Sequence, residues 1–187
     1  MTDNFINDKK IRDEIVWYIK DLLREANQKI ILNYFNNLKS NDISTKTSDD
    51  DFVSIADKKS EELICKKLLG FLNVKKFIGE EASYLNNKQY ITLLNEPLVW
   101  VVDPIDGTKN YINGKDTFCS MISLVSFSIP IATFIYYPLK KNYVYAFKGF
   151  GAYSVKIDTN KITKLSINQT TPKLILGSGG TKGIPDP

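Results

Sequence analysis

The chain has 187 residues, 43% hydrophobic and 25% charged, which suits one domain or one domain plus part of another. The net charge of +4 is small and the lysines are spread along the chain, so the charge does not indicate a nucleic-acid partner. Histidine is absent, which excludes serine–histidine triads, histidine bases and histidine-ligated zinc from these residues. Carboxylates, hydroxyls, lysines, backbone groups and hard metals remain for any chemistry.

The two cysteines, Cys65 and Cys119, lack the spacing of paired metal ligands, so we expect free thiols in a reducing compartment. The N-terminal residues do not have the pattern of a signal peptide. No apolar run approaches the roughly 18 residues that span a bilayer. We therefore expect a cytoplasmic protein with no membrane association.

Two helices are expected in the first third of the chain. Apolar residues between 8 and 37 recur at intervals of three and four, which predicts one helix with a core-facing stripe. The polar stretch from Leu38 to Asp51 reads as a loop or a short hairpin. A second helix is expected to follow Ala56 and to run to Gly70, with Asp57 or a neighbour as its cap.

Strand patterns dominate the rest of the chain. Phe77-Ile78 is a short apolar step, and residues 84–96 read as a helix or an irregular insertion. Gly, Pro and Asn punctuate the expected strands, which are 98–102, 118–127, 131–137, 142–147, 152–157, 162–167 and 173–176. Helices followed by closely spaced strands predict an α+β fold, with helices layered on a largely antiparallel sheet over residues 1–176. Residues 177–187 read as a loop-like tail.

An aspartate turn follows the expected strand 98–102. The strand delivers Asp103 to the edge of the sheet, where Pro104 favours an extended backbone, and Asp106 comes three residues later. Such a turn can direct both carboxylates and the carbonyl of Ile105 at one point, which suits Mg²⁺. A plain surface turn is the alternative, because these residue types all favour turns.

Two features extend this turn into a candidate phosphate and metal site. Gly107 allows close approach of the backbone, and a helix beginning near Thr108 would direct N–H groups at an anion. Glu80 and Glu81 form a second acidic cluster, which indicates a site with more than one metal. Asp57 ends a third apolar step, where helix capping is the alternative interpretation.

These segments together resemble the inositol monophosphatase family, part of the lithium-sensitive, magnesium-dependent phosphatase superfamily. The segments that carry the resemblance are Trp100-Val-Val-Asp-Pro-Ile-Asp-Gly-Thr108 with Asn110-Tyr111, Phe77-Ile-Gly-Glu-Glu81 and Asp51-Phe-Val-Ser-Ile-Ala-Asp57. Asp57, Glu80 and Asp103 follow one another at intervals of 23 residues, in the order and spacing of the family. The similarity runs from about residue 8 to about residue 176 and implies the layered α/β sandwich of inositol monophosphatases and fructose-1,6-bisphosphatases.

The resemblance implies a Mg²⁺ centre with two or three sites in the complete family fold. It assigns Glu80, Asp103 and the Ile105 carbonyl to the first metal. Asp103 bridges to the second metal, which Asp106 also binds near a substrate hydroxyl.

The resemblance also implies the groups that bind phosphate and activate water. Backbone N–H groups of Gly107 and Thr108 hold the phosphate, and the Thr108 hydroxyl, bonded to Asp57, orients and deprotonates the attacking water. Glu80 assists through a further water. Lys46 matches a lysine that the family often places near the site, although a solvated loop lysine is the alternative.

The implied reaction is direct attack of metal-activated water on a phosphate monoester, without a phosphoenzyme. A small phosphorylated polyol, sugar or nucleotide is the expected substrate class, and a homodimer the expected assembly. Activity on the phosphate monoester of a small polyol or sugar, such as inositol phosphate, is the leading expectation. The alternatives are activity on 3′(2′),5′-bisphosphate nucleotides, fructose 1,6-bisphosphate or histidinol phosphate, and a non-catalytic metal-binding role.

One family element is missing from the sequence. Family members continue into a smaller α/β domain, whose Trp-Asp-x-Ala-Ala-Gly-type motif completes the second metal site. No such motif occurs in these residues. A shortened sequence, a second polypeptide that supplies the missing half, or a degenerate protein are the three explanations.

Overall fold

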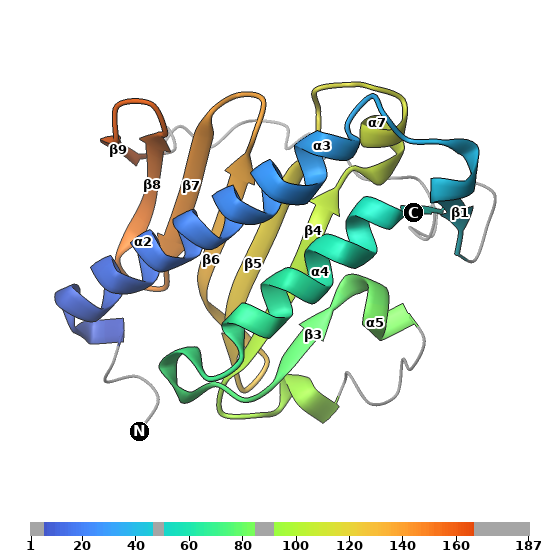
Figure 1. Ribbon diagram of the computed structural model, residues 1–187. Helices are drawn as coiled ribbons and strands as arrows, with labels where there is room; N and C mark the ends of the chain where they lie inside the picture. The colour runs from blue at the N-terminus through green and yellow to red at the C-terminus, as the bar shows by residue number, and fades with distance from the viewer. Residues whose placement is uncertain (1–5, 47–50, 85–91, 167–187) are drawn as a thin grey trace, which may run out of the picture.

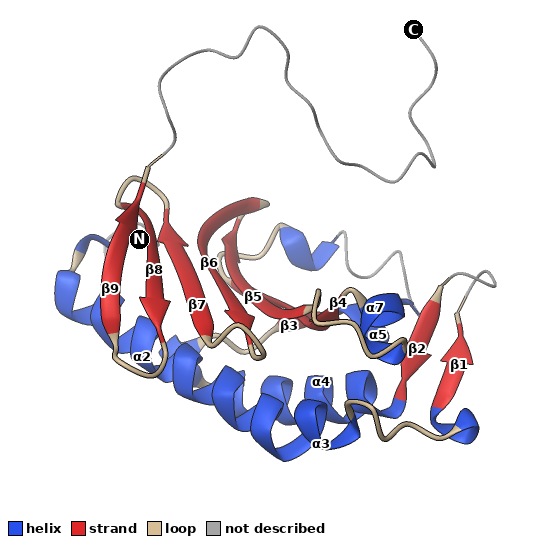
Figure 2. Cartoon of the chain, turned by 90° about the horizontal axis from the view of Figure 1, so that it is seen from above, coloured by secondary structure: helices blue, strands red, loops and turns tan. Residues whose placement is uncertain are grey.

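The computed structural model describes residues 6–46, 51–84 and 92–166. Within these ranges a seven-stranded sheet is crossed by the helices α2 (Lys9–Ala26) and α4 (Ile55–Leu68) (Figure 1). Both helices lie on the same face of the sheet (Figure 2). This arrangement confirms the expected α+β class, with helices layered on a largely antiparallel sheet.

The first helix is longer than α2 alone. Asp8 caps its start by accepting the N–H of Lys10 at 2.7 Å, and α2 continues through the π-helical turn η1 (Asn27–Ile31) into α3 (Leu32–Tyr34). The expected helix over 8–37 is thus confirmed, except that it ends at Tyr34, because Phe35 has extended backbone. The π turn was not foreseen, since the apolar periodicity of a single widened turn differs little from that of an α-helix.

The second long helix, α4, was expected to follow Ala56 and begins slightly earlier, at Ile55. Ser54 is its N-cap and accepts the N–H of Ala56 at 3.2 Å, while Asp57 accepts the N–H of Ser54 at 2.8 Å. This is a capping box, in which a cap side chain and the third helical residue satisfy each other's backbone donors. Asp57 is therefore not the cap itself, but it completes the capping arrangement.

The polar stretch after the first helix contains the 3₁₀ turn η2 (Ser40–Asp42) and β1 (Ile43–Thr45). β1 pairs with β2 (Phe52–Ser54) in an antiparallel sheet of its own. The expected hairpin over Leu38 to Asp51 is thus present, except that its second strand lies just beyond Asp51. After α4 come the 3₁₀ turn η3 (Phe71–Asn73), β3 (Phe77–Gly79) and α5 (Glu80–Tyr84).

The larger sheet has the order β3-β4-β5-β6-β7-β8-β9. The bounds of its remaining strands are β4 Val99–Asp106, β5 Cys119–Ser126, β6 Ile129–Tyr137, β7 Asn142–Phe147, β8 Gly151–Lys156 and β9 Lys161–Leu165, with α7 (Thr108–Ile112) between β4 and β5. These bounds confirm the expected strands within a few residues. Most of the segment 84–96, the expected strand 173–176 and the tail 177–187 lie outside the described residues.

The main core lies between the helices and the sheet. Ile15, Ile19 and Leu23 of α2 are fully buried and join a cluster with Phe134 and Tyr143 of the sheet. Burying each such aliphatic side chain contributes roughly 1.5–3 kcal/mol. This core fixes the sheet beneath α2 and α4, and so fixes the sheet edge at which the acidic residues lie. None of the helices in the described residues combines the length and the apolar character needed to span a bilayer.

Candidate active site

Glu80 and Asp103 lie at the same edge of the sheet because β3 and β4 are parallel. Gly79, the last residue of β3, is paired with Val102, and Glu80 and Asp103 are the next residues of the two segments. Their carboxyl groups are close enough to share a hydrogen bond. The carboxyl ends of neighbouring parallel strands lie at the same side of a sheet, so an acidic residue that follows each strand lies beside the other. Burial of β3 and β4 leaves these two carboxylates on the boundary between core and surface.

A bulge at the end of β4 separates Asp103 from Asp106. Asp103 is paired with Met121 and Asp106 with Cys119, so β4 carries one residue more than β5 over this step. Pro104 lies in the bulge, where its missing N–H does not interrupt a regular ladder. The bulge leaves Asp103 half-buried and Asp106 exposed.

Local hydrogen bonds fix the direction of this turn. The Asp103 carboxylate accepts the N–H of Ile105 at 3.1 Å, which closes a turn over the proline. Asp106 is contacted by the thiol of Cys119, with Sγ and Oδ2 3.6 Å apart. The two aspartates of the motif are thus held by different neighbours on either side of the bulge.

Asp57 and Thr108 come together from elements 51 residues apart. The Thr108 hydroxyl lies 3.2 Å from Oδ1 of Asp57 and 3.0 Å from the carbonyl oxygen of Ile105. Its single proton can serve one of these acceptors at a time, and its oxygen can itself accept a bond from a water. Oδ2 of Asp57 accepts the hydroxyl of Ser54 at 2.5 Å, so the carboxylate is held at both oxygens.

Gly107 turns the chain from β4 into α7. Its φ of +90° lies in the left-handed region, and a Cβ there would lie 2.9 Å from the carbonyl oxygen of Thr117. Glycine is therefore required by both backbone conformation and space. α7 begins at Thr108, as the sequence predicted.

Lys46 reaches the site from the β1–β2 hairpin. Its ammonium group lies 2.9 Å from Oε1 of Glu80 and 2.8 Å from Oε1 of Glu81, and only 6% of its side chain is exposed. Burial lowers the pKa of Lys46, but the hydrogen bonds and charges of Glu81 and Glu80 outweigh burial and hold the pKa above its usual value. Lys46 is therefore not the solvated loop lysine of the alternative interpretation, because its side chain is buried and forms ion pairs.

Burial and an excess of negative charge raise the pKa values of carboxyl groups in the site, among them Asp103 and Asp57. Burial, then the charge of Glu80 and a hydrogen bond with it, and then the charges of Asp106 and Asp57 raise the pKa of Asp103 to about 8. Burial also raises the pKa of Asp57, against the hydrogen bonds from Ser54 and Thr108. Clusters of like charge with raised pKa values are typical of functional sites.

The donors of this cluster fit a hard divalent cation in their chemistry. Glu80 and Asp103 supply carboxylate oxygens and Ile105 a carbonyl oxygen, which are the ligand types that Mg²⁺ prefers. A cation would also relieve the repulsion that raises the pKa of Asp103. Among the residues that the structure describes, no three acidic or thiol side chains are already grouped as metal ligands.

The structure adds residues that the sequence analysis did not select. Glu61 lies four positions after Asp57 on the buried side of α4 and contacts the start of α5. Tyr111 of α7 is fully buried. The interval of four from Asp57 to Glu61 was a signal that the two side chains share a helix face.

Comparisons with known proteins identify the family of the chain. A model described as the inositol monophosphatase family matches residues 13–180. The chain belongs to the inositol monophosphatase family. All of the candidate site residues lie within the matched segment.

Two curated relatives illustrate how far the similarity extends. A protein of Aquifex aeolicus named fructose-1,6-bisphosphatase/inositol-1-monophosphatase is 33% identical over 143 residues, covering 74% of this chain and 51% of the relative. Inositol monophosphatase 1 of Solanum lycopersicum is 34% identical over 128 residues, covering 68% of this chain and 44% of the relative. The chain spans about half the length of these curated relatives.

Solved structures show the same fold. CysQ from Bacteroides thetaiotaomicron, described as a bacterial member of the inositol monophosphatase family, matches with a TM-score of 0.53 and 31% identity, over 71% of this chain and 45% of that one. An IMPase of Thermotoga maritima matches with a TM-score of 0.63 over 76% of this chain and 51% of that one, and at 22% identity it supports the fold alone.

Proposed function

We propose that this chain carries the phosphate- and metal-binding half of a Mg²⁺-dependent phosphoric monoester hydrolase. The observation that carries the proposal is the meeting of Glu80, Asp103, Asp57 and Thr108 at one edge of the sheet. Family membership supports the class of reaction. The match covers 51% and 44% of the two relatives, and we propose that the complete active site also takes groups from outside the matched segment.

Asp57 and Thr108 are proposed to prepare the attacking water. Asp57 is fully buried and lies within hydrogen-bond distance of the Thr108 hydroxyl. When the Thr108 proton points to Asp57, the hydroxyl oxygen can take a proton from a water on its outer side while its own proton passes to Asp57. The raised pKa of Asp57 makes it a better proton acceptor than an exposed aspartate.

Glu80, Asp103, Asp106 and the Ile105 carbonyl are proposed to hold Mg²⁺. Bound there, the metal supplies positive charge to the phosphate oxygens and lowers the pKa of water. Gly107 and Thr108 are proposed to donate backbone N–H groups to the phosphate, as their place at the start of α7 and the family resemblance support. Lys46 orients Glu80 and Glu81 and lowers the cost of gathering their charges.

The proposed substrates are monophosphates of small polyols or sugars. The relatives carry names that include inositol monophosphatase and fructose-1,6-bisphosphatase, and a solved relative was determined with 2′AMP bound. Inositol phosphate is the first choice. Bisphosphate nucleotides, fructose 1,6-bisphosphate and histidinol phosphate are alternatives, and side-by-side turnover of these compounds would rank them.

A homodimer in the cytoplasm is the proposed context. The free, buried thiols of Cys65 and Cys119 support a reducing compartment. Sedimentation equilibrium on the chain would measure the assembly state, and a purely monomeric protein would contradict the dimer.

Asp103→Asn tests the function directly. Phosphate release from inositol phosphate should require Mg²⁺ and should fall by at least about 100-fold in this variant, because the proposed bridging ligand loses its charge. Asp158→Asn is the control, since Asp158 forms only an exposed ion pair with Lys141. Equal activity of Asp103→Asn and Asp158→Asn would rule out the proposed role. Calorimetric Mg²⁺ binding with no turnover in wild-type protein would instead favour a non-catalytic metal-binding role.

A further inference from the structure

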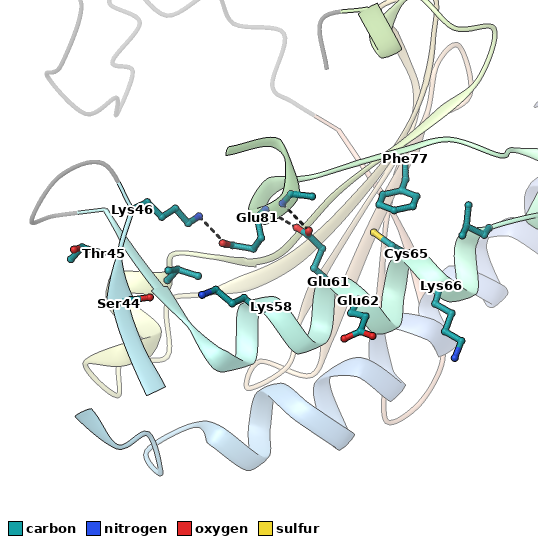
Figure 3. Close-up of a pocket in the computed structure, with 13 residues that line it drawn as sticks. Ser44, Thr45, Lys46, Lys58, Glu61, Glu62, Cys65, Lys66, Phe77 and Glu81 are labelled. Carbon is teal, nitrogen blue, oxygen red and sulfur yellow. Dashed lines mark hydrogen bonds and ion pairs between the residues drawn. The ribbon is translucent and has the colours of Figure 1, made fainter. Parts of the chain in front are cut away.

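Glu61 of α4 is a buried carboxylate close to the acidic site. Only 6% of the residue is exposed, and its carboxylate meets the first turn of α5 (Figure 3). Oε2 accepts the N–H of Glu81 at 2.7 Å and Oε1 accepts the N–H of Ala82 at 3.0 Å. Each oxygen of one side chain is thus bound to a successive backbone donor.

These two bonds replace partners that α5 cannot supply itself. The first N–H groups of any helix have no intrahelical acceptor, and α5 has only five residues. A helix of that length is unstable alone, so tertiary contacts decide where it points. The Glu61 carboxylate is the contact that takes both donors.

Gly79 makes room for this contact. A Cβ at position 79 would lie 2.3 Å from the carboxyl carbon of Glu61 and 2.4 Å from one of its oxygens. The glycine before Glu80 therefore leaves space for the carboxylate. The Phe77-Ile-Gly-Glu-Glu81 segment and Glu61 fit each other as a pair.

We propose that Glu61 is the positioning residue for the acidic pair: by clamping the first turn of α5, it sets where Glu80 and Glu81 present their carboxylates. Glu80 is thereby held beside Asp103, and Glu81 beside Lys46. Glu61 acts through the backbone of α5. This inference rests on the proposed function, because it assigns Glu61 a share in metal affinity.

The surroundings of Glu61 predict which property of the protein a substitution there would change. Glu61 and Glu81 line a cleft of about 740 Å³, together with Lys46, Cys65 and Phe77. Water in the cleft can reach the freed N–H groups, so the fold should survive a substitution. Water cannot fix the position of the first turn of α5, so a substitution of Glu61 should change where the carboxylates of Glu80 and Glu81 lie.

Glu61→Gln is the test, with Glu62→Gln as the matched control. Gln keeps the volume but has one acceptor oxygen in place of two. Glu62 is the exposed neighbour on the same helix and lines the same cleft, yet it makes none of the bonds to α5 described above. Both variants lose one negative charge, so the comparison isolates the clamp.

Two measurements separate the inference from the proposed function. Amide hydrogen exchange at Glu81 and Ala82 should be at least about 10-fold faster in Glu61→Gln than in wild type or Glu62→Gln. Mg²⁺ affinity, measured by calorimetry, should fall about 10- to 100-fold in Glu61→Gln, as for residues that orient metal ligands. Gly79→Ala, which pushes on the carboxylate from the other side, should give the same two changes.

The outcomes are distinct. Wild-type Mg²⁺ affinity in Glu61→Gln, with exchange at Glu81 and Ala82 accelerated, would overturn the positioning role and leave Glu61 a structural cap. Unchanged exchange would overturn the clamp itself. If wild-type protein binds no Mg²⁺, the proposed function fails, and the exchange measurement still decides whether Glu61 holds α5.

Discussion

The hydroxyl of Tyr111 donates a hydrogen bond of 2.6 Å to the carbonyl of Ile31, which joins α7 to the last residue of the π-helical turn. Both residues are fully buried. The same carbonyl oxygen also accepts the backbone N–H of Phe35 at 3.0 Å, so Ile31 bonds to the end of its own helix and to the tyrosine. The bond ties the short helix that begins at Thr108 to the longest helix of the fold.

Tyr111→Phe should destabilise the chain by about 0.5–1.5 kcal/mol, because the buried carbonyl of Ile31 loses its side-chain donor but keeps the N–H of Phe35. Urea denaturation would measure this loss. Tyr143→Phe is the control, since Tyr143 is also fully buried and donates to a carbonyl of the same long helix, that of Val16. Similar losses of stability are expected, but only Tyr111→Phe should weaken Mg²⁺ binding. Equal Mg²⁺ affinity in both variants would contradict a role for this bond in the site.

Gly107→Ala should cost about 2 kcal/mol or more, from a left-handed backbone and a Cβ 2.9 Å from the carbonyl of Thr117. Gly149→Ala separates the two effects, because Gly149 has a φ of +82° with nothing within 4 Å of an added Cβ. Gly149→Ala should therefore show only the cost of backbone conformation. Thermal unfolding of both variants would test this, and equal losses would show that the contact at Gly107 relaxes freely.

Lys46→Met should destabilise the metal-free chain by about 3 kcal/mol at pH 8, because it leaves the charges of Glu80 and Glu81 without their buried partner. The cost should shrink towards pH 5, since burial already raises the pKa of Glu81 to about 7 and Glu81 then takes up a proton. Urea unfolding at the two pH values gives the comparison. Lys141→Met, which breaks an exposed pair with Asp158, should have little effect at either pH. A loss that is independent of pH would argue against a charged Glu81.

The raised pKa values of Asp103 and Glu81, about 8 and about 7, predict an unusual pH profile for the metal-free protein. Between the ordinary carboxyl pKa near 4 and these values, the folded state binds more protons than the unfolded state. Stability should therefore fall as pH rises from about 5 to about 8, by at least about 1 kcal/mol, since one pKa unit corresponds to about 1.4 kcal/mol.

Urea midpoints in EDTA would measure this slope, and saturating Mg²⁺ should flatten it by binding the ionised carboxylates. Asp103→Asn should also flatten the slope in EDTA, because its side chain no longer takes up the proton. Stability that rises with pH in EDTA would contradict the charge cluster.

Much of the fold was predictable from the sequence because it depends on local patterns. Apolar periodicity located the long helices, and runs of β-branched and aromatic residues located the strands within a few residues. The aspartate and glutamate motifs were visible because strands that end in acids are costly to bury without a partner. The helix that begins at Thr108 was also predictable, because glycine at position 107 readily adopts the backbone conformation of the turn before it.

Other features depended on contacts between distant segments. The interval of four from Asp57 places Glu61 on the same helix face, but it does not show that Glu61 caps α5, because the partners of Glu61 are 20 and 21 residues away. The π turn, the burial of Lys46 and the bond from Tyr111 to Ile31 are likewise products of tertiary packing.

The sequence by itself thus identified the acidic residues of the site, the glycine turn and the family to which the chain belongs. The tertiary structure decided which of those acidic residues are neighbours. Parallel pairing of β3 with β4 places Glu80 beside Asp103, and the bulge after Asp103 leaves Asp106 exposed to solvent. The physical reason is that residue types and spacing are encoded locally, whereas strand direction, register and burial are set by the packing of the whole sheet against its helices.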